Sequence, residues 1–261
     1  MTNMVYLPLD WTAFCWWAGN RGLIGHGALD EGFALHVLLS SVFGKSVLQP
    51  FRLLHPSRAP TATLYAYSDR THDALRKVAG DVGPPDCLQV LKVDELLAKP
   101  MPRRFRAGQR LGFDARVRPI RRLARDLPDS QSGKVLRKGS EIDAFRLELI
   151  QRSPDGWRKP DERSPAGISR ESVYVGWLSE RLANVADVDG NACRLASFRR
   201  SRALRGNGKG PEGPDAILHG ECVVRDPVEF AARLRTGVGR HRAFGYGMLI
   251  VRPPGTAPRS V

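Results

Sequence analysis

The 261 residues predict an α+β protein made of two tandem ferredoxin-like domains, each with the element order β-α-β-β-α-β. Two observations support this fold class. Segments rich in Val, Tyr, Leu and Phe alternate with segments whose apolar residues recur at helical spacing, and this alternation occurs twice along the chain. The length also suits two small domains, each with its own core. We therefore expect domains at residues 1–100 and 101–253, followed by a tail at 254–261.

The first domain begins with a strand and a glycine-rich segment. Residues 30–43 then carry apolar side chains at helical spacing and end at Gly44, which predicts the first helix. An open sheet of the kind that results is used by RNA-recognition domains. The expected strands are 4–17, 51–54, 61–67 and 87–93, the glycine-rich segment is 19–27, and the second helix is 71–79.

The second domain repeats this order with two interruptions. Its last helix is expected after Asp226, because Asp is a good N-cap and the proline that follows is favoured at the first helical position. The basic insertion at 121–167 is rich in proline and charge, so it is expected to be either functional or disordered. The interruption at 201–214 is expected to be a flexible loop or a hairpin tip, and the tail to be disordered. The expected strands are 110–120, 186–199, 216–224 and a last strand after residue 247, and the other helix is 169–182.

The chain is strongly basic. Lys and Arg number 41 against 27 Asp and Glu, which gives a formal net charge of +14. A chain this basic typically binds a polyanion such as nucleic acid, and a solvated basic surface is the alternative. The sequence has no apolar run of about 20 residues and no signal peptide, so we expect a cytoplasmic protein without membrane contact. Four scattered cysteines predict reduced core residues instead of disulfides or a zinc site.

The glycine-rich loop at 237–247 is the most informative part of the sequence. Four glycines lie among basic residues directly before an apolar strand. Glycine lets backbone N–H groups approach an anion, and Arg235, Arg240 and Arg242 add positive charge, so the pattern predicts a loop that contacts phosphate. A tight turn between a helix and an edge strand is the structural alternative.

This loop resembles a known family signature. It reads Gly237-Val238-Gly239-Arg240-His241-Arg242-Ala243-Phe244-Gly245-Tyr246-Gly247-Met248-Leu249, with Pro253 soon after. The run resembles the ending of the repeat-associated RNA-binding superfamily of CRISPR proteins, most closely its CasE-type endonucleases, which cut precursor CRISPR RNA. A second segment, Glu31-Gly32-Phe33-Ala34-Leu35-His36, resembles the family pattern D-x-Y-x-L-H at the start of the first helix, with Glu for Asp and Phe for Tyr. The resemblance covers most of the chain and implies tandem ferredoxin-like domains.

The resemblance implies metal-independent RNA cleavage with no cofactor. A ribose 2′-OH attacks the adjacent phosphate and leaves a 2′,3′-cyclic phosphate and a 5′-OH, which requires a base, an acid and nearby cations. His36 matches the family's catalytic histidine; a histidine on an apolar stretch is otherwise more often structural. Some relatives use Arg or Lys, and the connection before the first helix is unusually glycine-rich, so Arg21, His26 and Arg242 are rival catalytic candidates. No cluster of His, Cys or carboxylates in the sequence has metal-ligand spacing.

Basic residues in the middle of the chain are the expected RNA-binding surface. Nine arginines lie between residues 103 and 125 against a single acid, Asp114, and Arg116 and Arg118 share one strand face. The run at 132–139 resembles the basic Gly-Lys segment of CasE relatives, and such cations suit the phosphates of A-form RNA. Solvated surface charges are the alternative. The expected RNA-binding residues are Arg103, Arg104, Arg116, Arg118, Arg121, Arg122, Arg125, Lys134, Arg137, Lys138, Arg199, Arg200, Gly237, Gly239, Arg240 and His241.

The sequence thus favours a CRISPR RNA-processing endoribonuclease that binds the repeat hairpin, cleaves at its base and retains the mature crRNA. Its expected partners are precursor and mature crRNA and the other subunits of a multi-protein effector complex. A non-catalytic crRNA-binding subunit of such a complex is the alternative, and a general basic RNA-binding protein outside CRISPR systems is a third hypothesis. The choice depends on whether His36, Arg21, His26 and Arg242 converge on one phosphate.

Overall fold

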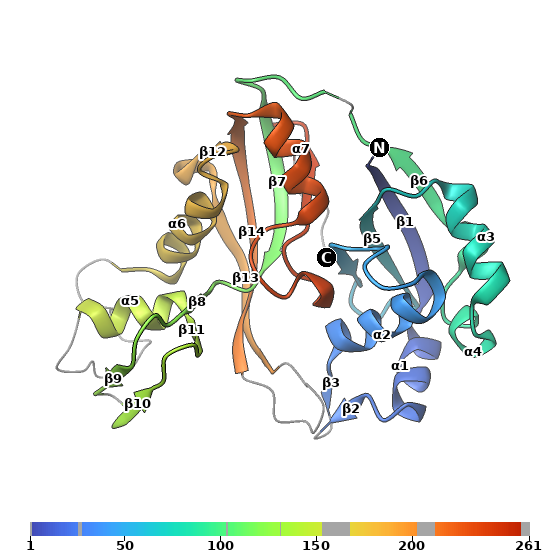
Figure 1. Cartoon of the computed structure of the whole chain (residues 1–261), viewed down its shortest axis with the longest axis horizontal. Coiled ribbons are helices and arrows are strands. Elements are labelled where there is room, and N and C mark those ends of the chain that lie inside the picture. Colours follow the sequence, from blue (N-terminus) through green and yellow to red (C-terminus); the bar gives the residue numbers. More distant parts are fainter. Residues whose placement is uncertain are drawn as a thin grey trace.

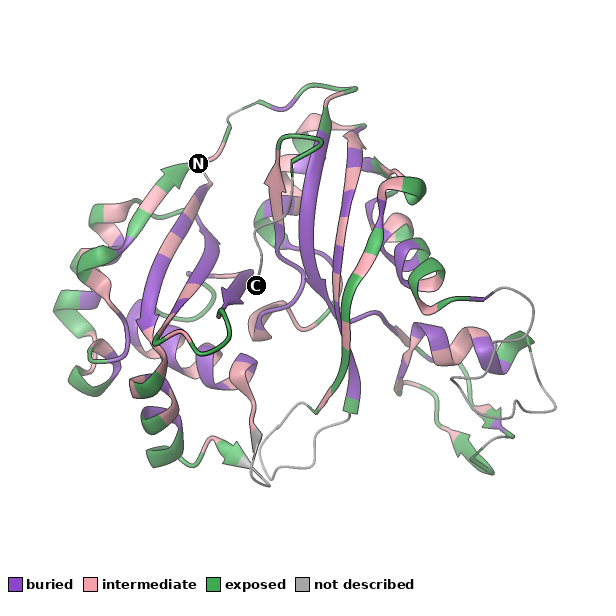
Figure 2. Ribbon diagram, turned by 180° about the vertical axis from the view of Figure 1, so that it is seen from behind, coloured by how far each residue is buried: buried purple, intermediate pink, exposed green. Residues whose placement is uncertain are grey.

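Two antiparallel sheets lie side by side in the computed structural model, each accompanied by its own helices (Figure 1). The structure describes residues 2–25, 28–102, 104–130, 132–152, 168–202 and 212–256. Buried residues concentrate in the central strands of both sheets (Figure 2). The expected α+β class with two tandem ferredoxin-like domains is confirmed by the strand orders of the two sheets.

The N-terminal domain contains a four-stranded sheet of order β4-β5-β1-β6. Alternate residues of β1, namely Val5, Leu7 and Leu9, are fully buried and share one core with Leu35 and Leu38 of α2. The elements of this domain are β1 (Asn3–Asp10), α1 (Trp11–Asn20), β2 (Ile24–Gly25), β3 (Ala28–Leu29), α2 (Glu31–Phe43), β4 (Phe51–Leu54), β5 (Thr61–Ser68), α3 (His72–Val82), α4 (Pro85–Leu88), the 3-10 helix η1 (Val93–Glu95) and β6 (Leu97–Pro100).

Two strand predictions for this domain are wrong. The strand expected at 4–17 ends at Asp10, whose side chain accepts a hydrogen bond from a backbone N–H of α1 and so caps that helix. The aromatic residues that follow belong to the helix, which buries Phe14 and Trp17 against the core. The strand expected at 87–93 is replaced by α4 and η1. The fourth strand is β6, whose mostly exposed residues carry no alternating pattern.

The C-terminal domain contains a five-stranded sheet of order β12-β14-β7-β15, with β13 also paired to β14. Phe113, Ala115 and Val117 of β7 are buried in one core with Trp177 and Leu178 of α6. The elements are β7 (Arg110–Val117), β8 (Ile120–Arg122), β9 (Leu127–Asp129), β10 (Lys134–Leu136), β11 (Glu141–Asp143), α5 (Ala144–Arg152), α6 (Arg170–Leu182), β12 (Ala186–Val188), the 3-10 helix η3 (Gly190–Ala192), β13 (Arg194–Arg202), β14 (Glu212–Val224), α7 (Pro227–Thr236), the 3-10 helix η4 (Arg242–Phe244) and β15 (Leu249–Arg252).

Helix starts in this domain agree with the predictions, and strand boundaries differ. Asp226 accepts hydrogen bonds from two backbone N–H groups of α7, as expected of an N-cap. The strand expected at 186–199 is divided into β12 and β13 by η3, which Asp189 caps. The strand expected at 110–120 divides at Pro119, and β8 leaves the main sheet to pair with β11.

The insertion is folded over its described part. β8 pairs with β11, β9 with β10, and α5 packs on α6, around a small apolar cluster that includes Leu123, Ile142 and Ile150. Residues 153–167 of the insertion lie outside the described ranges, as do 203–211 of the second interruption and most of the tail. The chain on either side of 203–211 forms the paired strands β13 and β14.

The cysteines are free, and three of the four are buried. Burial raises the pKa of the Cys193 thiol to about 11 and that of Cys222 to about 12, so both stay protonated at neutral pH. These thiols behave as core side chains, in agreement with the prediction. Among the described helices, none is both long and apolar enough to cross a membrane.

Candidate active site and nucleic-acid interface

The glycine-rich loop joins α7 to β15 and is held by its own backbone. The Val238 N–H donates to the Gly247 carbonyl at 2.8 Å, and the Gly247 N–H donates to the Arg116 carbonyl in β7 at 2.7 Å. Gly247 has a φ of 81°, and a Cβ there would lie 2.2 Å from the Val238 carbonyl oxygen. A Cβ at Gly239 would lie 2.7 Å from the Trp177 ring. In the free protein, these glycines therefore serve tight turns and close packing.

The loop contacts the first turns of α2, so the two family motifs lie together although they come from opposite ends of the chain (Figure 1). A Cβ at Gly32 would lie 2.4 Å from the Phe244 carbonyl oxygen, which shows how closely η4 approaches the helix. The centre of the Phe244 ring lies 6.3 Å from that of Phe33 and 5.3 Å from that of His36, the latter edge-on at 67°. His36 is therefore at the junction of the N-terminal helix and the C-terminal loop.

The surroundings of His36 favour its neutral form. The side chain is half-buried beside a small pocket that Ser40, Gln49 and Ala243 also line. Partial burial lowers the pKa of His36, and the positive charge of Lys45 lowers it further. The ring can thus accept a proton at neutral pH. Sequence reasoning missed Lys45, because nothing in its local sequence distinguishes it from a solvated lysine.

Arg242 contacts the end of α7 through its side chain. It belongs to η4, which packs on α2, and its neighbour Ala243 lines the same pocket as His36. Its guanidinium Nη1 donates to the Thr236 carbonyl at 2.7 Å. Of the rival candidates, Arg242 thus belongs to the segment that packs on α2, with its guanidinium bound at the end of α7.

The described contacts of Arg21 are with residues of α1 and α4. It follows the end of α1, forms an ion pair with Asp86 of α4 at 2.6 Å and lies over the Trp17 ring. His26 lies outside the described residues. Within those residues, no group of three or more His, Cys, Asp or Glu could hold a metal ion.

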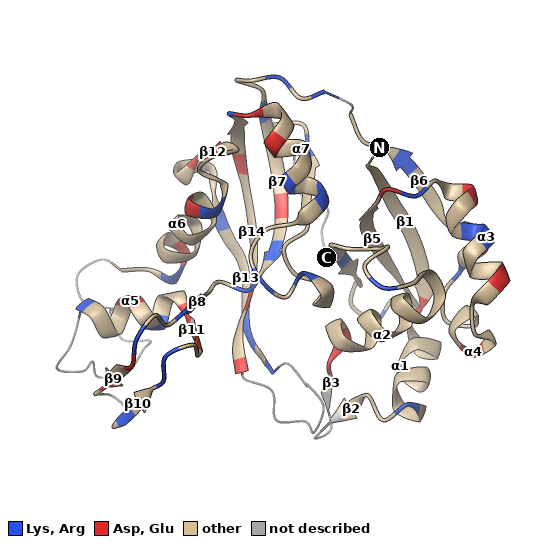
Figure 3. Cartoon of the chain, viewed as in Figure 1, with Lys and Arg blue, Asp and Glu red and all other residues tan. Residues whose placement is uncertain are grey.

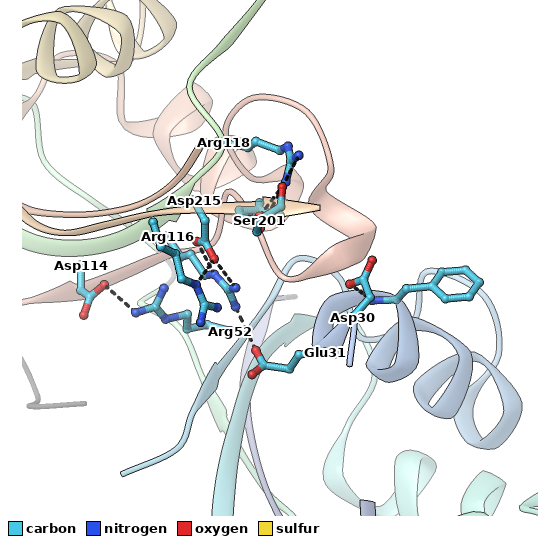
Figure 4. Close-up of polar contacts among 11 residues, drawn as sticks. Asp30, Glu31, Arg52, Asp114, Arg116, Arg118, Ser201 and Asp215 are labelled. Atoms are coloured by element: carbon cyan, nitrogen blue, oxygen red, sulfur yellow. Dashed lines mark hydrogen bonds and ion pairs between the residues drawn. The ribbon is translucent and has the colours of Figure 1, made fainter. Parts of the chain in front are cut away.

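Arg116 and Arg118 are buried, which disfavours the RNA contacts predicted for them. Arg116 donates to the two Asp215 carboxylate oxygens at 2.8 and 2.7 Å and to Glu31 Oε1 at 3.0 Å (Figure 4). Burial opposes its charged form, but hydrogen bonds and charge from Asp215 hold the pKa of Arg116 well above its usual value. Arg118 donates to Ser201 Oγ at 3.0 Å. The two guanidinium groups thus join strands and domains inside the protein.

Most of the other predicted cations belong to the insertion or to β13, where Figure 3 marks several Lys and Arg positions, and Arg104 lies in the connection between β6 and β7. Some form surface ion pairs, such as Arg137 with Asp126 at 2.9 Å and Arg200 with Glu212 at 2.8 Å. Exposed pairs of this kind contribute little to stability, so their cations remain available to phosphate. Arg103 lies outside the described residues. The exposed or half-exposed members of the predicted set are Arg104, Arg121, Arg122, Arg125, Lys134, Arg137, Lys138, Arg199 and Arg200.

Glu141 at the start of β11 binds two neighbouring side chains of the loop, Arg240 and His241. Its Oε1 accepts from Arg240 Nε at 2.7 Å, and its Oε2 lies 2.9 Å from His241 Nε2. Partial burial opposes ionisation of this carboxyl, but His241 and Arg240 lower the pKa of Glu141 overall, so it is charged at neutral pH. Sequence reasoning missed Glu141, because its partners lie 99 and 100 residues further along the chain.

A tandem ferredoxin-like fold whose last loop packs on His36 of α2 agrees with the class of CRISPR proteins indicated by the sequence motifs. The chain belongs to the CRISPR-associated family, because residues 19–253 match the model described as "CRISPR associated protein". The predicted family resemblance is thereby confirmed.

Solved structures share this fold along nearly the whole chain. Cse3 of Thermus thermophilus, bound to an RNA representing a pre-cleavage complex, is 19% identical with a TM-score of 0.59, covering 97% of this chain and 99% of that one. A Cse3 endoribonuclease bound to a 19 nt RNA is 20% identical, with a TM-score of 0.58 and coverage of 96% and 100%. Cas6e of Escherichia coli str. K-12 is 17% identical, with a TM-score of 0.57 and coverage of 97% and 100%. No curated protein matches the sequence.

Proposed function

We propose that this chain is a metal-independent CRISPR RNA-processing endoribonuclease that binds the repeat hairpin, cleaves at its base and retains the mature crRNA. The observation that carries the proposal is the contact between the His36 and Phe244 rings, whose centres are 5.3 Å apart, because it joins the motif at the start of α2 to the glycine-rich loop. RNA in the Cse3 structures of the same fold supports RNA as the ligand. A CRISPR RNA-guided surveillance complex, which contains a chain of this fold at a TM-score of 0.51, supports a place in a larger assembly.

In the proposed reaction, His36 accepts the proton of the ribose 2′-OH, and the oxygen attacks the adjacent phosphorus. The lowered pKa of His36 supports this role, because a base must be unprotonated before it can act. Arg242, which belongs to the 3-10 helix packed on α2, stabilises the negative charge that develops on the phosphate. The bond from phosphorus to the 5′-oxygen breaks, leaving a 2′,3′-cyclic phosphate and, after proton transfer, a 5′-OH.

The RNA stem is proposed to lie along the insertion and β13. The β9–β10 hairpin carries exposed Lys134, Arg137 and Lys138 at its tip and flank, and β13 carries exposed Arg199 and Arg200. Cations along a double-stranded stem read its shape and phosphates. The same contacts persist after cleavage, which supports retention of the product.

The test is single-turnover cleavage of a cognate repeat hairpin in EDTA with saturating protein. We expect a 2′,3′-cyclic phosphate product, and we expect a 2′-deoxy nucleotide at the scissile position to abolish cleavage while binding persists. Cleavage that is lost in EDTA and restored by a divalent ion would refute metal independence. Tight hairpin binding without any cleavage would instead favour the non-catalytic crRNA-binding subunit.

A further inference from the structure

The contact of Glu141 with the glycine-rich loop is unusual, because the loop is proposed to bind an anion and Glu141 is itself negatively charged. One carboxylate bridges Arg240 and His241, at 2.7 and 2.9 Å, and both partners belong to the glycine-rich loop. The Arg240 side chain is 55% exposed, and Glu141 retains 19%. The Arg240 half of the contact therefore lies at the surface, where a ligand could replace the carboxylate, whereas the His241 side chain is 3% exposed beneath it.

The carboxylate resembles one edge of a phosphodiester. Each presents two oxygens that share a negative charge, and guanidinium and imidazolium donors bind either group with similar geometry. A donor pair that holds a carboxylate at these distances is thus also shaped for two oxygens of an RNA phosphate.

The loop does not depend on Glu141 for its shape. Backbone hydrogen bonds from Gly237 to Arg233, from Val238 to Gly247 and from Gly247 to Arg116 close it independently. Loss of the Glu141 contact should therefore leave the loop in place and release the Arg240 guanidinium.

We propose that Glu141 occupies the position of an RNA phosphate on Arg240 and His241 in the free protein, and that the RNA displaces it on binding. Glu141 then acts as an internal competitor that weakens the phosphate contact of the loop. This inference rests on the proposed RNA-binding function.

The test compares the affinity of Glu141→Gln and wild-type protein for a repeat hairpin carrying a 2′-deoxy nucleotide at the scissile position, over a series of salt concentrations. Glutamine keeps the shape and removes the charge. We expect binding about 3- to 10-fold tighter at each salt concentration, with a slope of log K against log salt near that of wild type, because the same phosphate contacts form in both complexes. Arg240→Ala in the same chain should remove the gain.

Asp187→Asn is the matched control, because it removes one negative charge from a surface pair with Arg225 at 2.5 Å, on strand β12 away from the loop. It should leave affinity and slope near wild type. Unchanged or weaker binding by Glu141→Gln, an equal gain in Asp187→Asn, or a gain that survives Arg240→Ala would overturn the inference. Wild-type protein that fails to bind the hairpin would overturn the proposed function and this inference together, whereas a binding wild type with an unresponsive Glu141→Gln refutes the inference alone.

Discussion

Arg116 of β7 donates a hydrogen bond to Glu31 Oε1 at 3.0 Å and so joins the C-terminal sheet to the first residue of the helix that carries His36 (Figure 4). The same guanidinium is held from within its own domain by Asp215. The interface between the two domains therefore contains a buried, fully charged pair close to the candidate site. Removal of one member of such a pair leaves the other charge buried without compensation.

Arg116→Met should lower the free energy of unfolding by about 3 kcal/mol, the lower end of the range for breaking a buried pair, because the buried Asp215 then keeps only the exposed Arg199 as an ionic partner. Urea unfolding followed by circular dichroism measures the loss. Arg121→Met is the control: its pair with Glu180 is exposed, so the change should be under about 1 kcal/mol. A small loss of unfolding free energy in Arg116→Met, together with a smaller slope of log K against log salt for RNA binding, would indicate that Arg116 contacts RNA.

Asp215 should make the free energy of unfolding depend on pH in the acidic range. Burial opposes its ionisation, but Arg116 and Arg199 lower the pKa of Asp215 from 3.8 to about 2. Because the folded state holds this proton less tightly than the unfolded state, the stabilisation is present above about pH 4 and is lost as the pH falls toward 2. The loss attributable to this group is about 2 kcal/mol, at about 1.4 kcal/mol per pKa unit.

Urea unfolding of wild type and Asp215→Asn between about pH 2 and pH 5 checks this dependence. The variant should be less stable at pH 5 and should show a shallower decline. An equal decline in both proteins would assign the acid sensitivity to other carboxyl groups.

The pH profile of cleavage should report the lowered pKa of His36. Since the neutral ring is the proposed base, the single-turnover rate should rise with pH through a midpoint below 6.5. Lys45→Ala removes a positive charge that disfavours imidazolium, so the midpoint should move upward. Lys92→Ala removes the same charge at a surface pair with Glu95 and should leave the midpoint unchanged. An identical midpoint in all three proteins would show that another group controls the rate.

Alanine variants of the four catalytic candidates should differ in cleavage rate according to where each residue lies in the structure. His36→Ala should lower the single-turnover rate by about 10²- to 10⁴-fold, the range for general acid–base catalysis. Arg242→Ala should cost about 10²- to 10³-fold through lost charge stabilisation. Arg21→Ala should cleave at nearly the wild-type rate, because Arg21 is paired with Asp86 on another surface. His26→Ala completes the set, and near-wild-type rates for all four would mean that the active site is elsewhere.

The exposed hairpin of the insertion should contribute to the salt dependence of RNA binding. Lys134→Ala combined with Lys138→Ala should reduce the slope of log K against log salt by about 1.4 to 1.8, since each lost phosphate contact removes about 0.7 to 0.9. Lys77→Ala with Lys99→Ala removes the same charge from exposed positions on the N-terminal domain and serves as control. Equal slopes in the two double variants would place the RNA away from the β9–β10 hairpin.

Helix boundaries were predictable because their signals are local. Asp226 caps α7 and Gly44 ends α2 as the sequence indicated, since a cap acts within one helical turn. Strand predictions failed where the strand propensity of a segment disagrees with the structure that its tertiary contacts favour. The aromatic run after Asp10 has the composition of a strand, yet it packs as α1, and β6 forms from an exposed segment because β1 offers it a free edge.

By itself, the sequence determined the tandem fold and the family, because these follow from local patterns and from a family signature. The contact between the His36 motif and the glycine-rich loop was decided by the tertiary structure, since the two segments are about 200 residues apart in sequence. Only the tertiary structure decided which cations remain available to RNA. Arg116 is used by Glu31 and Asp215, and Arg240 by Glu141, and each of these ion pairs joins residues from distant parts of the chain. Charge composition cannot reveal such pairing, because the energy of an ion pair depends on distance and burial in the folded state and not on separation in sequence.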